Sequence, residues 1–148
     1  MREILFRGKR TDNGEWVYGY YAHLHKTTYC FKEDCDAHPE NELHRMIFEH
    51  EQDWGLPNYH LQVDVDPETV GQYIGLKDKN GTKIFEGDIV KRFWFGKMCI
   101  YQIDYDNGLA RFIGRAGMIF KASFYYDSEE FEVVGNIYDN PELLGGNG

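Results

Sequence analysis

The sequence predicts a mainly β fold of the α+β kind, with an N-terminal β-hairpin, one helical insertion and a small C-terminal SH3-like or partly open β-barrel. Three observations predict it. Aromatic residues, which favour strands, make up 16% of the chain. Many short segments alternate between apolar and polar residues, which is the period of a strand. Turn sequences rich in glycine, several of them Asn-Gly, separate these segments.

The length of 148 residues indicates a single domain, residues 1–148. Two lobes are expected within it. Residues 1–76 hold the hairpin and an acidic helical insertion at about 24–64, and residues 77–145 form the β-barrel. The last residues, 145–148, are predicted to be a disordered tail because they are glycine-rich and terminal.

The net charge of −9 is concentrated in the middle of the chain. Residues 31–68 hold two basic and eleven acidic residues, which equals the whole net charge. An acidic protein is a poor general binder of the phosphate backbone, so the composition disfavours a nucleic-acid partner.

The cysteines Cys30, Cys35 and Cys99 are an odd number and widely spaced. No apolar run suits a signal peptide or a membrane span, so no membrane association is predicted. These features together predict a cytoplasmic protein with reduced thiols.

The N-terminal hairpin is predicted from residues 3–7 and 15–21, which flank a turn at 11–14. After it, a helix is predicted from about Pro39 to Gln52, with Pro39 as a favourable first residue. Four residues recur at the spacing of one helical face: Leu43, Met46, Ile47 and His50. This face is expected to pack against the sheet or against a partner subunit.

The stretch from Asp66 to Val90 predicts a second hairpin. Val70 to Leu76 alternates as a strand does, and its glycines leave one thin face that another backbone can approach. A polar segment ending in Asn80-Gly81 then suits a tight turn into a returning strand at 83–85.

The same stretch carries a family resemblance. TVGQYIGLKDKNGTKIFEGDIV, residues 69–90, resembles the signature of the YopX family, which comprises small proteins of bacteriophages and prophages. Residues 2–21 and 132–144 fit the same family. The resemblance implies a mainly β fold, a phage or prophage origin and therefore a bacterial host cell. It implies no reaction.

Short strands are predicted throughout the rest of the chain. Residues 98–105 and 109–113 are expected to form a hairpin around Asp106-Asn107-Gly108. Residues 90–95, 118–120 and 131–138 are predicted as further strands, the last with a bulge at Gly135. Five or so short strands with tight turns suggest the small barrel.

Potential metal ligands gather in the insertion: Cys30, Cys35, His38, His44 and His50. Thiolates and imidazoles are the natural ligands of zinc. Their spacing is not that of a zinc finger, and His44 and His50 would face different sides of the predicted helix. Surface histidines and free cysteines explain the same residues, so no metal and no cofactor is predicted.

No enzyme is predicted, because the chain lacks the recognisable motifs of nucleophilic, phosphate-binding and metalloprotease sites. Glu86 and Asp88 are two carboxylates on one strand face and could divide acid and base roles. A solvated corner is the preferred interpretation of both.

A binding surface is the better functional hypothesis. Aromatic and basic residues are interleaved on strands expected to be neighbours: Arg92, Trp94, Lys97, Tyr101, Arg111 and Arg115. An ordinary aromatic core with basic edges is the simpler interpretation of the same set. The sequence therefore predicts an accessory protein that acts by binding a protein or by self-association as a homo-oligomer. The alternative is a β-barrel module that binds single-stranded nucleic acid.

Overall fold

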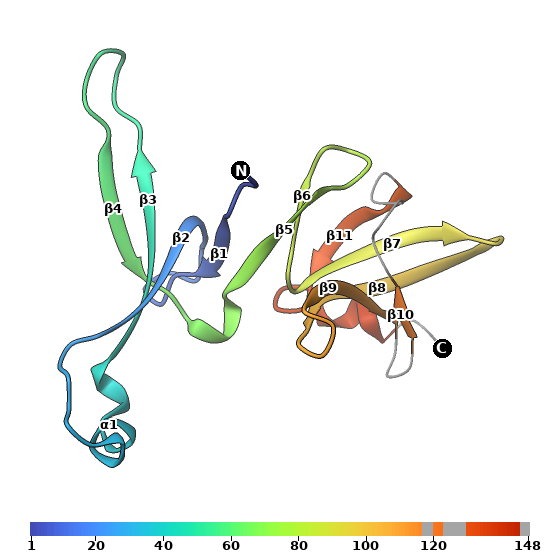
Figure 1. Cartoon of the computed structure of the whole chain (residues 1–148). Helices are drawn as coiled ribbons and strands as arrows, with labels where there is room; N and C mark the ends of the chain where they lie inside the picture. The colour runs from blue at the N-terminus through green and yellow to red at the C-terminus, as the bar shows by residue number, and fades with distance from the viewer. Residues whose placement is uncertain (117–119, 123–129, 146–148) are drawn as a thin grey trace. The chain divides into compact units, whose positions relative to one another are not determined.

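The computed structural model describes residues 1–116, 120–122 and 130–145 (Figure 1). The chain folds as two compact units, one of residues 5–70 and the other of residues 1–4 and 71–148. The sequence placed the boundary between the two lobes after residue 76.

The first unit is built on antiparallel strands in the order β4-β3-β2-β1. Their bounds are β1 (Phe6–Lys9), β2 (Trp16–His25), β3 (Glu42–His50) and β4 (Tyr59–Asp64). Three short helical segments complete the unit: α1 (Lys32–Ala37), η1 (Pro39–Asn41) and η2 (Pro67–Thr69). The predicted N-terminal hairpin is confirmed, since β1 pairs antiparallel with β2.

The helix predicted from Pro39 to Gln52 is wrong, because residues 42–50 form strand β3. The helical spacing of the apolar residues is real, but pairing with β2 on one side and β4 on the other outweighs it. Met46 is fully buried in the sheet, and Arg45 forms an ion pair with Asp64 on β4 at 3.0 Å. Cross-strand partners of this kind decide the conformation of a segment of ambiguous local pattern.

The second unit contains a two-stranded hairpin and a five-stranded antiparallel sheet in the order β10-β9-β8-β7-β11. The hairpin consists of β5 (Gly71–Lys77) and β6 (Lys83–Phe85). The sheet consists of β7 (Asp88–Trp94), β8 (Lys97–Asp106), β9 (Arg111–Ala116), β10 (Phe120–Ala122) and β11 (Glu132–Asn136). A short η4 helix (Pro141–Leu144) follows.

The predicted turns and bulge are present. Gly81 has a φ of 81° in the β5–β6 turn, where Asn-Gly predicted positive φ. The β8–β9 hairpin also forms, but its loop is longer than predicted and Ala110 has the positive φ, 51°. The β11–β7 register shifts between Val133 and Gly135, which confirms the bulge. The thin face of β5 is confirmed at Gly71, which the main chain of Glu86 approaches closely, but Gly75 has open space beside it and a φ of 91°.

The core of the second unit lies on one face of the five-stranded sheet. Its members are buried side chains from β6, β7, β8 and the residue before β11: Ile84, Val90, Tyr101, Ile103 and Phe131. Asp78, in the β5–β6 turn, is buried, and its carboxylate accepts hydrogen bonds from the main chain of Asn80, Thr82 and Val133, each at 2.9 Å. This carboxylate therefore joins the β5–β6 turn to β11.

Both units consist mainly of antiparallel strands, which confirms the mainly β fold. Among the described strands, β10 and β11 are the two edges of the five-stranded sheet, so that sheet is not a closed barrel. Residues 118–119 of a predicted strand and residues 146–148 of the predicted tail lie outside the described residues. In the described part of the chain, no helix has the length and apolar character needed to span a membrane.

Candidate functional site

The six residues predicted to bind a partner lie on three neighbouring strands, two on each. Arg92 and Trp94 lie on β7, Lys97 and Tyr101 on β8, and Arg111 and Arg115 on β9. The strands are neighbours, as predicted, since β8 pairs with β7 on one side and with β9 on the other.

The register divides the six residues between the two faces of the sheet. Trp94 lies opposite Lys97, and Gln102 lies opposite Arg115. Side chains alternate along a strand, and opposed residues share a face. Four of the residues (Arg92, Trp94, Lys97 and Tyr101) are therefore on one face, and Arg111 and Arg115 are on the other. The predicted set is not one continuous surface.

Arg92 and Tyr101 support the fold instead of meeting solvent. The Arg92 guanidinium lies 3.8 Å from the centre of the Trp94 ring, and its Nε and Nη2 donate to Glu130 Oε2 at 2.8 and 2.7 Å. Arg92 is only 7% exposed and Tyr101 4%. Burial raises the pKa of Tyr101, whose ring packs edge-on against Phe131. Arg92 thus holds Trp94 in place.

On the opposite face, Arg115 and Arg111 have different surroundings. Arg115 Nε donates to Asp104 Oδ2 at 2.6 Å, which neutralises its charge. Arg111 lines a pocket of about 480 Å³ together with Arg2, Gln72, Glu86, Tyr105, Ala110 and Phe112. Burial raises the pKa of Glu86, which accepts a hydrogen bond from the Gln72 main chain at 2.9 Å.

The solvated corner predicted for Glu86 and Asp88 is wrong, since Glu86 is half-buried and Asp88 is buried. That side chain is 1% exposed, and its Oδ2 accepts a hydrogen bond from the Phe85 main chain at 2.8 Å. Asp88 therefore closes the turn between β6 and β7, which explains an aspartate at the start of a buried strand.

The tip of the β7–β8 hairpin, residues 93–98, is a surface of which the sequence predicted only Trp94 and Lys97. Four large apolar side chains are exposed there: Phe93, Trp94, Phe95 and Met98. Trp94 pairs with Lys97, so Phe95 and Gly96 form a two-residue turn, with φ values of 46° and 76°. Positive φ at both positions is the signature of a type I′ turn. In the sequence, Gly96 between two segments of alternating pattern is the feature that predicts this turn.

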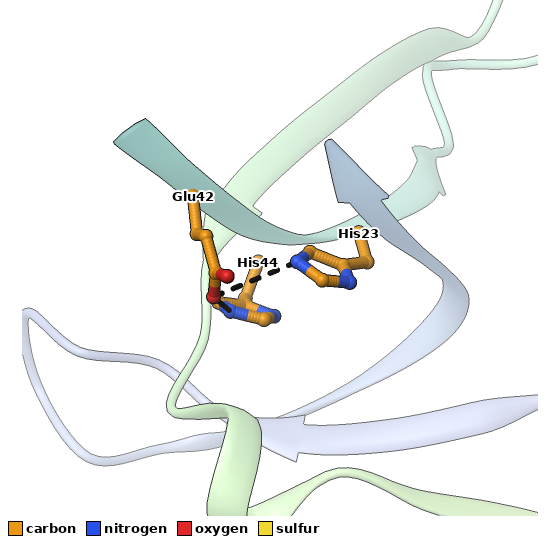
Figure 2. A group of neighbouring side chains, drawn as sticks. All are labelled: His23, Glu42 and His44. Atoms are coloured by element: carbon orange, nitrogen blue, oxygen red, sulfur yellow. Dashed lines mark hydrogen bonds and ion pairs between the residues drawn. The ribbon is translucent and has the colours of Figure 1, made fainter. Parts of the chain in front are cut away.

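A second candidate site lies in the first unit, where β2 pairs with β3. His23 lies directly opposite His44, and Glu42 is two residues before His44 on the same face (Figure 2). The Glu42 Oε2 atom is 3.3 Å from His44 Nε2 and 3.7 Å from His23 Nε2. One donor atom from each of the three residues lies within 4.8 Å of the other two.

The surroundings of His44 fix the orientation of its ring. Tyr21 Oη is 2.5 Å from His44 Nδ1, so the other nitrogen, Nε2, faces Glu42. The ring of His23 stacks on that of His44, with centroids 4.4 Å apart. Burial raises the pKa of Tyr21, and the nearby Glu42 raises it further, so the hydroxyl keeps its proton at neutral pH.

The other potential ligands considered from the sequence are not part of this cluster. Cys30 and Cys35 are free thiols, His38 pairs with Glu40 at 2.7 Å, and His50 lies at the end of β3 opposite Tyr59. Within the described residues, His23, Glu42 and His44 are the one group of three or more such side chains that could hold an ion. The sequence did not predict this group, because His23 and His44 come together only when residues 42–50 form a strand that pairs with β2, and a helix was predicted there.

Comparisons with known proteins agree with the fold. The family model described as YopX protein matches residues 5–145. No curated protein matches the sequence. The chain is similar to the crystal structure of protein EF1440 from Enterococcus faecalis, with 24% identity, coverage of 97% of this chain and 99% of that one, and a TM-score of 0.51. That likeness shows the fold alone. Because the family model covers nearly the whole sequence, this chain belongs to the YopX family.

Proposed function

We propose that this protein is a non-catalytic accessory protein of a phage or prophage, and that it binds another protein through the tip of its β7–β8 hairpin. One observation supports the proposal above the others. Four large apolar side chains are exposed at this single turn, and Phe95 is 88% exposed. Phe93 and Met98 are opposed across the strands and share one face of the hairpin, Trp94 lies on the other face, and Phe95 is in the turn between them. Clustered exposed apolar groups are typical of protein-binding surfaces.

The backbone at Phe95 strengthens the proposal. A φ of 46° places this residue in the left-handed region, which costs a side chain with a Cβ about 1 kcal/mol or more. Asn or Asp would suit that position of a type I′ turn better than Phe does. An exposed aromatic at a strained position contributes little to folding, so a role in binding explains it.

The charges near the tip favour a protein partner over nucleic acid. Arg92 forms an ion pair with Glu130, and Arg115 forms one with Asp104 on the other face of the sheet, so neither charge is left to bind a phosphate. Lys97 lies opposite Trp94 across the strand pair, which suits a partner with an apolar pocket and acidic residues around it. A second copy meeting tip to tip would bring Lys97 against Lys97, so we infer a different protein as the partner.

The setting of this interaction is proposed to be the cytoplasm of a bacterial host. The three free thiols, Cys30, Cys35 and Cys99, suit a reducing compartment.

The test compares capture of host proteins by immobilised wild type with capture by two matched variants. Phe95→Asn removes the aromatic side chain and keeps a residue that tolerates positive φ. Leu109→Asn makes a similar change at the exposed β8–β9 loop and is the control. Loss of a central aromatic contact costs about 2 kcal/mol, so the Phe95 variant is expected to bind the captured protein about 30-fold more weakly.

Three results would contradict the proposal. Capture that is equally strong with Phe95→Asn would show that the tip is not the contact surface. A wild-type protein that forms stable oligomers in light scattering, with an assembly that Phe95→Asn disrupts, would make a second copy the occupant. Binding of a single-stranded oligonucleotide at low salt that depends on Trp94 would replace the protein partner with nucleic acid.

A further inference from the structure

We propose that His23, Glu42 and His44 form a binding site for a zinc ion in the first unit, independent of the binding role of the β7–β8 hairpin. The three residues come from paired strands and lie together on one face of the sheet, with Glu42 beside the stacked rings of His23 and His44 (Figure 2). The site would join β2 to β3 through an ion, with water as the fourth ligand.

The distances between the donor atoms fit a shared ion. Two ligand atoms that are each about 2.1 Å from a tetrahedral zinc ion lie about 3.4 Å apart. The Glu42 Oε2 atom is 3.3 Å from His44 Nε2 and 3.7 Å from His23 Nε2. One oxygen atom is therefore spaced from two imidazole nitrogens as two edges of a coordination tetrahedron require.

Another His–Glu pair in the same unit shows the geometry of a direct ion pair without a metal ion. His38 Nδ1 lies 2.7 Å from Glu40 Oε1, which is the length of a direct charge-assisted hydrogen bond. The Glu42 carboxylate makes no contact this short with either of its two histidines. A short ion pair accounts for His38 and Glu40, whereas Glu42 makes only a long hydrogen bond of 3.3 Å to His44. Rotation of the stacked His23 and His44 rings would turn both nitrogens toward an ion beside Glu42.

The hydrogen bond to Tyr21 supplies the support that metal-binding histidines need. A zinc-bound imidazole coordinates through one nitrogen and usually donates the N–H of the other to a nearby oxygen. Tyr21 Oη is 2.5 Å from His44 Nδ1, on the side of the ring away from Glu42. With the proton on Nδ1, the lone pair of Nε2 is directed toward the position of the ion.

The donor set selects the class of metal. Two imidazole nitrogens and one carboxylate oxygen suit a borderline transition-metal ion such as Zn²⁺, whereas Ca²⁺ and Mg²⁺ prefer sites made of oxygen atoms. Three protein ligands and one open position are also the usual composition of an accessible zinc site. The side chains of His23 and Glu42 are 44% and 48% exposed, so an ion can reach the site from solvent.

The experiment is a calorimetric titration of the full chain with Zn²⁺, with Mg²⁺ as the comparison ion. Wild type is expected to bind one Zn²⁺ and no Mg²⁺. His44→Gln and Glu42→Gln each remove one ligand and are expected to weaken binding by more than about 100-fold, whereas Tyr21→Phe removes only the supporting oxygen and weakens it about 10-fold. The control is His60→Gln, because His60 also lies near a glutamate, Glu49 at 3.8 Å, but has no second histidine.

Co²⁺ provides a second readout that distinguishes the ligands. Bound to His23, Glu42 and His44, it is expected to show visible d–d absorption without a thiolate charge-transfer band. Absence of Zn²⁺ binding to wild type at micromolar concentration would overturn the proposal. So would a thiolate band that the Cys30→Ser, Cys35→Ser double variant abolishes, or an affinity that His60→Gln lowers as much as His44→Gln does. Circular dichroism of each variant establishes that the sheet is intact.

Discussion

At Phe95, the residue type that the backbone favours differs from the aromatic residue that the proposed binding uses. Its φ of 46° favours Asn or Gly, but its ring is exposed and packs edge-on against the ring of Trp94, with the two ring centroids 4.8 Å apart. Phe95→Asn is therefore expected to leave the free energy of unfolding unchanged or to raise it by up to about 1 kcal/mol. Urea denaturation checks this value. A loss of more than about 1 kcal/mol would show that the Phe95 ring is needed for folding.

Gly19 is required by a close backbone approach in the first unit. A Cβ at this position would lie 2.2 Å from the main-chain oxygen of Ile47 on β3. Gly19→Ala is expected to force β2 away from β3 and to cost at least about 2 kcal/mol of stability, measured by thermal or urea denaturation.

The matched control for Gly19 is Gly8→Ala on β1 of the same sheet. A Cβ at Gly8 would meet side-chain atoms of Val70, Val65 and Met46 at 3.3 to 3.5 Å, and these atoms can shift. We expect a smaller effect, below about 1 kcal/mol. Equal losses at Gly8 and Gly19 would contradict the assigned β2–β3 pairing.

Single residues were predictable from the sequence where a local rule decides their conformation. Asn80-Gly81 predicted its turn, and Gly135 predicted its bulge, because φ and bulge preferences are local properties. The roles of Arg92 and Asp88 were not predictable in this way. Glu130, the partner of Arg92, is distant in the sequence, and the burial of Asp88 depends on the packing of the whole sheet.

At the scale of elements, β3 shows why a helical period can mislead. Leu43, Met46 and Ile47 fit one face of a helix, yet the segment is the middle strand between β2 and β4. Both neighbouring strands supply main-chain partners that a helix would not use, and residues such as Ile47 and Phe48 favour strands. The His23–Glu42–His44 cluster follows from this pairing, so the error about β3 also concealed the cluster.

The Asp78 carboxylate connects the β5–β6 turn to β11, and the stability that this connection contributes depends on pH. Burial by itself raises the pKa of Asp78, but main-chain N–H donors of Val133, Thr82 and Asn80 together hold it below its ordinary value. A carboxyl whose pKa is lower in the folded state stabilises the fold at any pH above its unfolded value, near 3.9. This contribution is lost as the pH falls through the folded pKa.

Asp78→Asn tests this connection between the β5–β6 turn and β11. The amide nitrogen would face one of the main-chain donors and leave it unsatisfied, which costs about 1–3 kcal/mol. We expect this stability difference from wild type to be constant between about pH 5 and 7 and to narrow below about pH 4. Urea denaturation across this pH range measures it, with Asp53→Asn at an exposed turn as the control. A difference that does not change with pH would rule out a contribution from the ionised carboxylate.

At the scale of the whole molecule, the two compact units carry the two proposed sites separately. The zinc ligands lie within residues 5–70, and the hairpin tip lies within residues 71–148. The mainly β character was predictable from alternation and turn sequences along the whole chain. The division into units after residue 70 depends on long-range packing, which those local patterns do not describe.

Zinc binding is expected to stabilise one unit selectively. At a free concentration 100 times the dissociation constant, an ion that binds only the folded state adds about 2.7 kcal/mol of stability. Hydrogen exchange with and without Zn²⁺ should therefore slow in β2 and β3 and stay unchanged in β7 and β8. Slowing that is equal in β7 and β8, or absent from β2 and β3, would contradict a site at His23, Glu42 and His44.

The central claim, that the β7–β8 tip contacts another protein, is tested most directly by photo-crosslinking in the bacterial host. A benzophenone amino acid replaces Phe95 in one variant and Leu109 in another. We predict a protein cross-link from position 95 that excess wild type abolishes and excess Phe95→Asn does not, with no such product from position 109. Equal products from both positions, or a product at 95 that Phe95→Asn also abolishes, would contradict the claim.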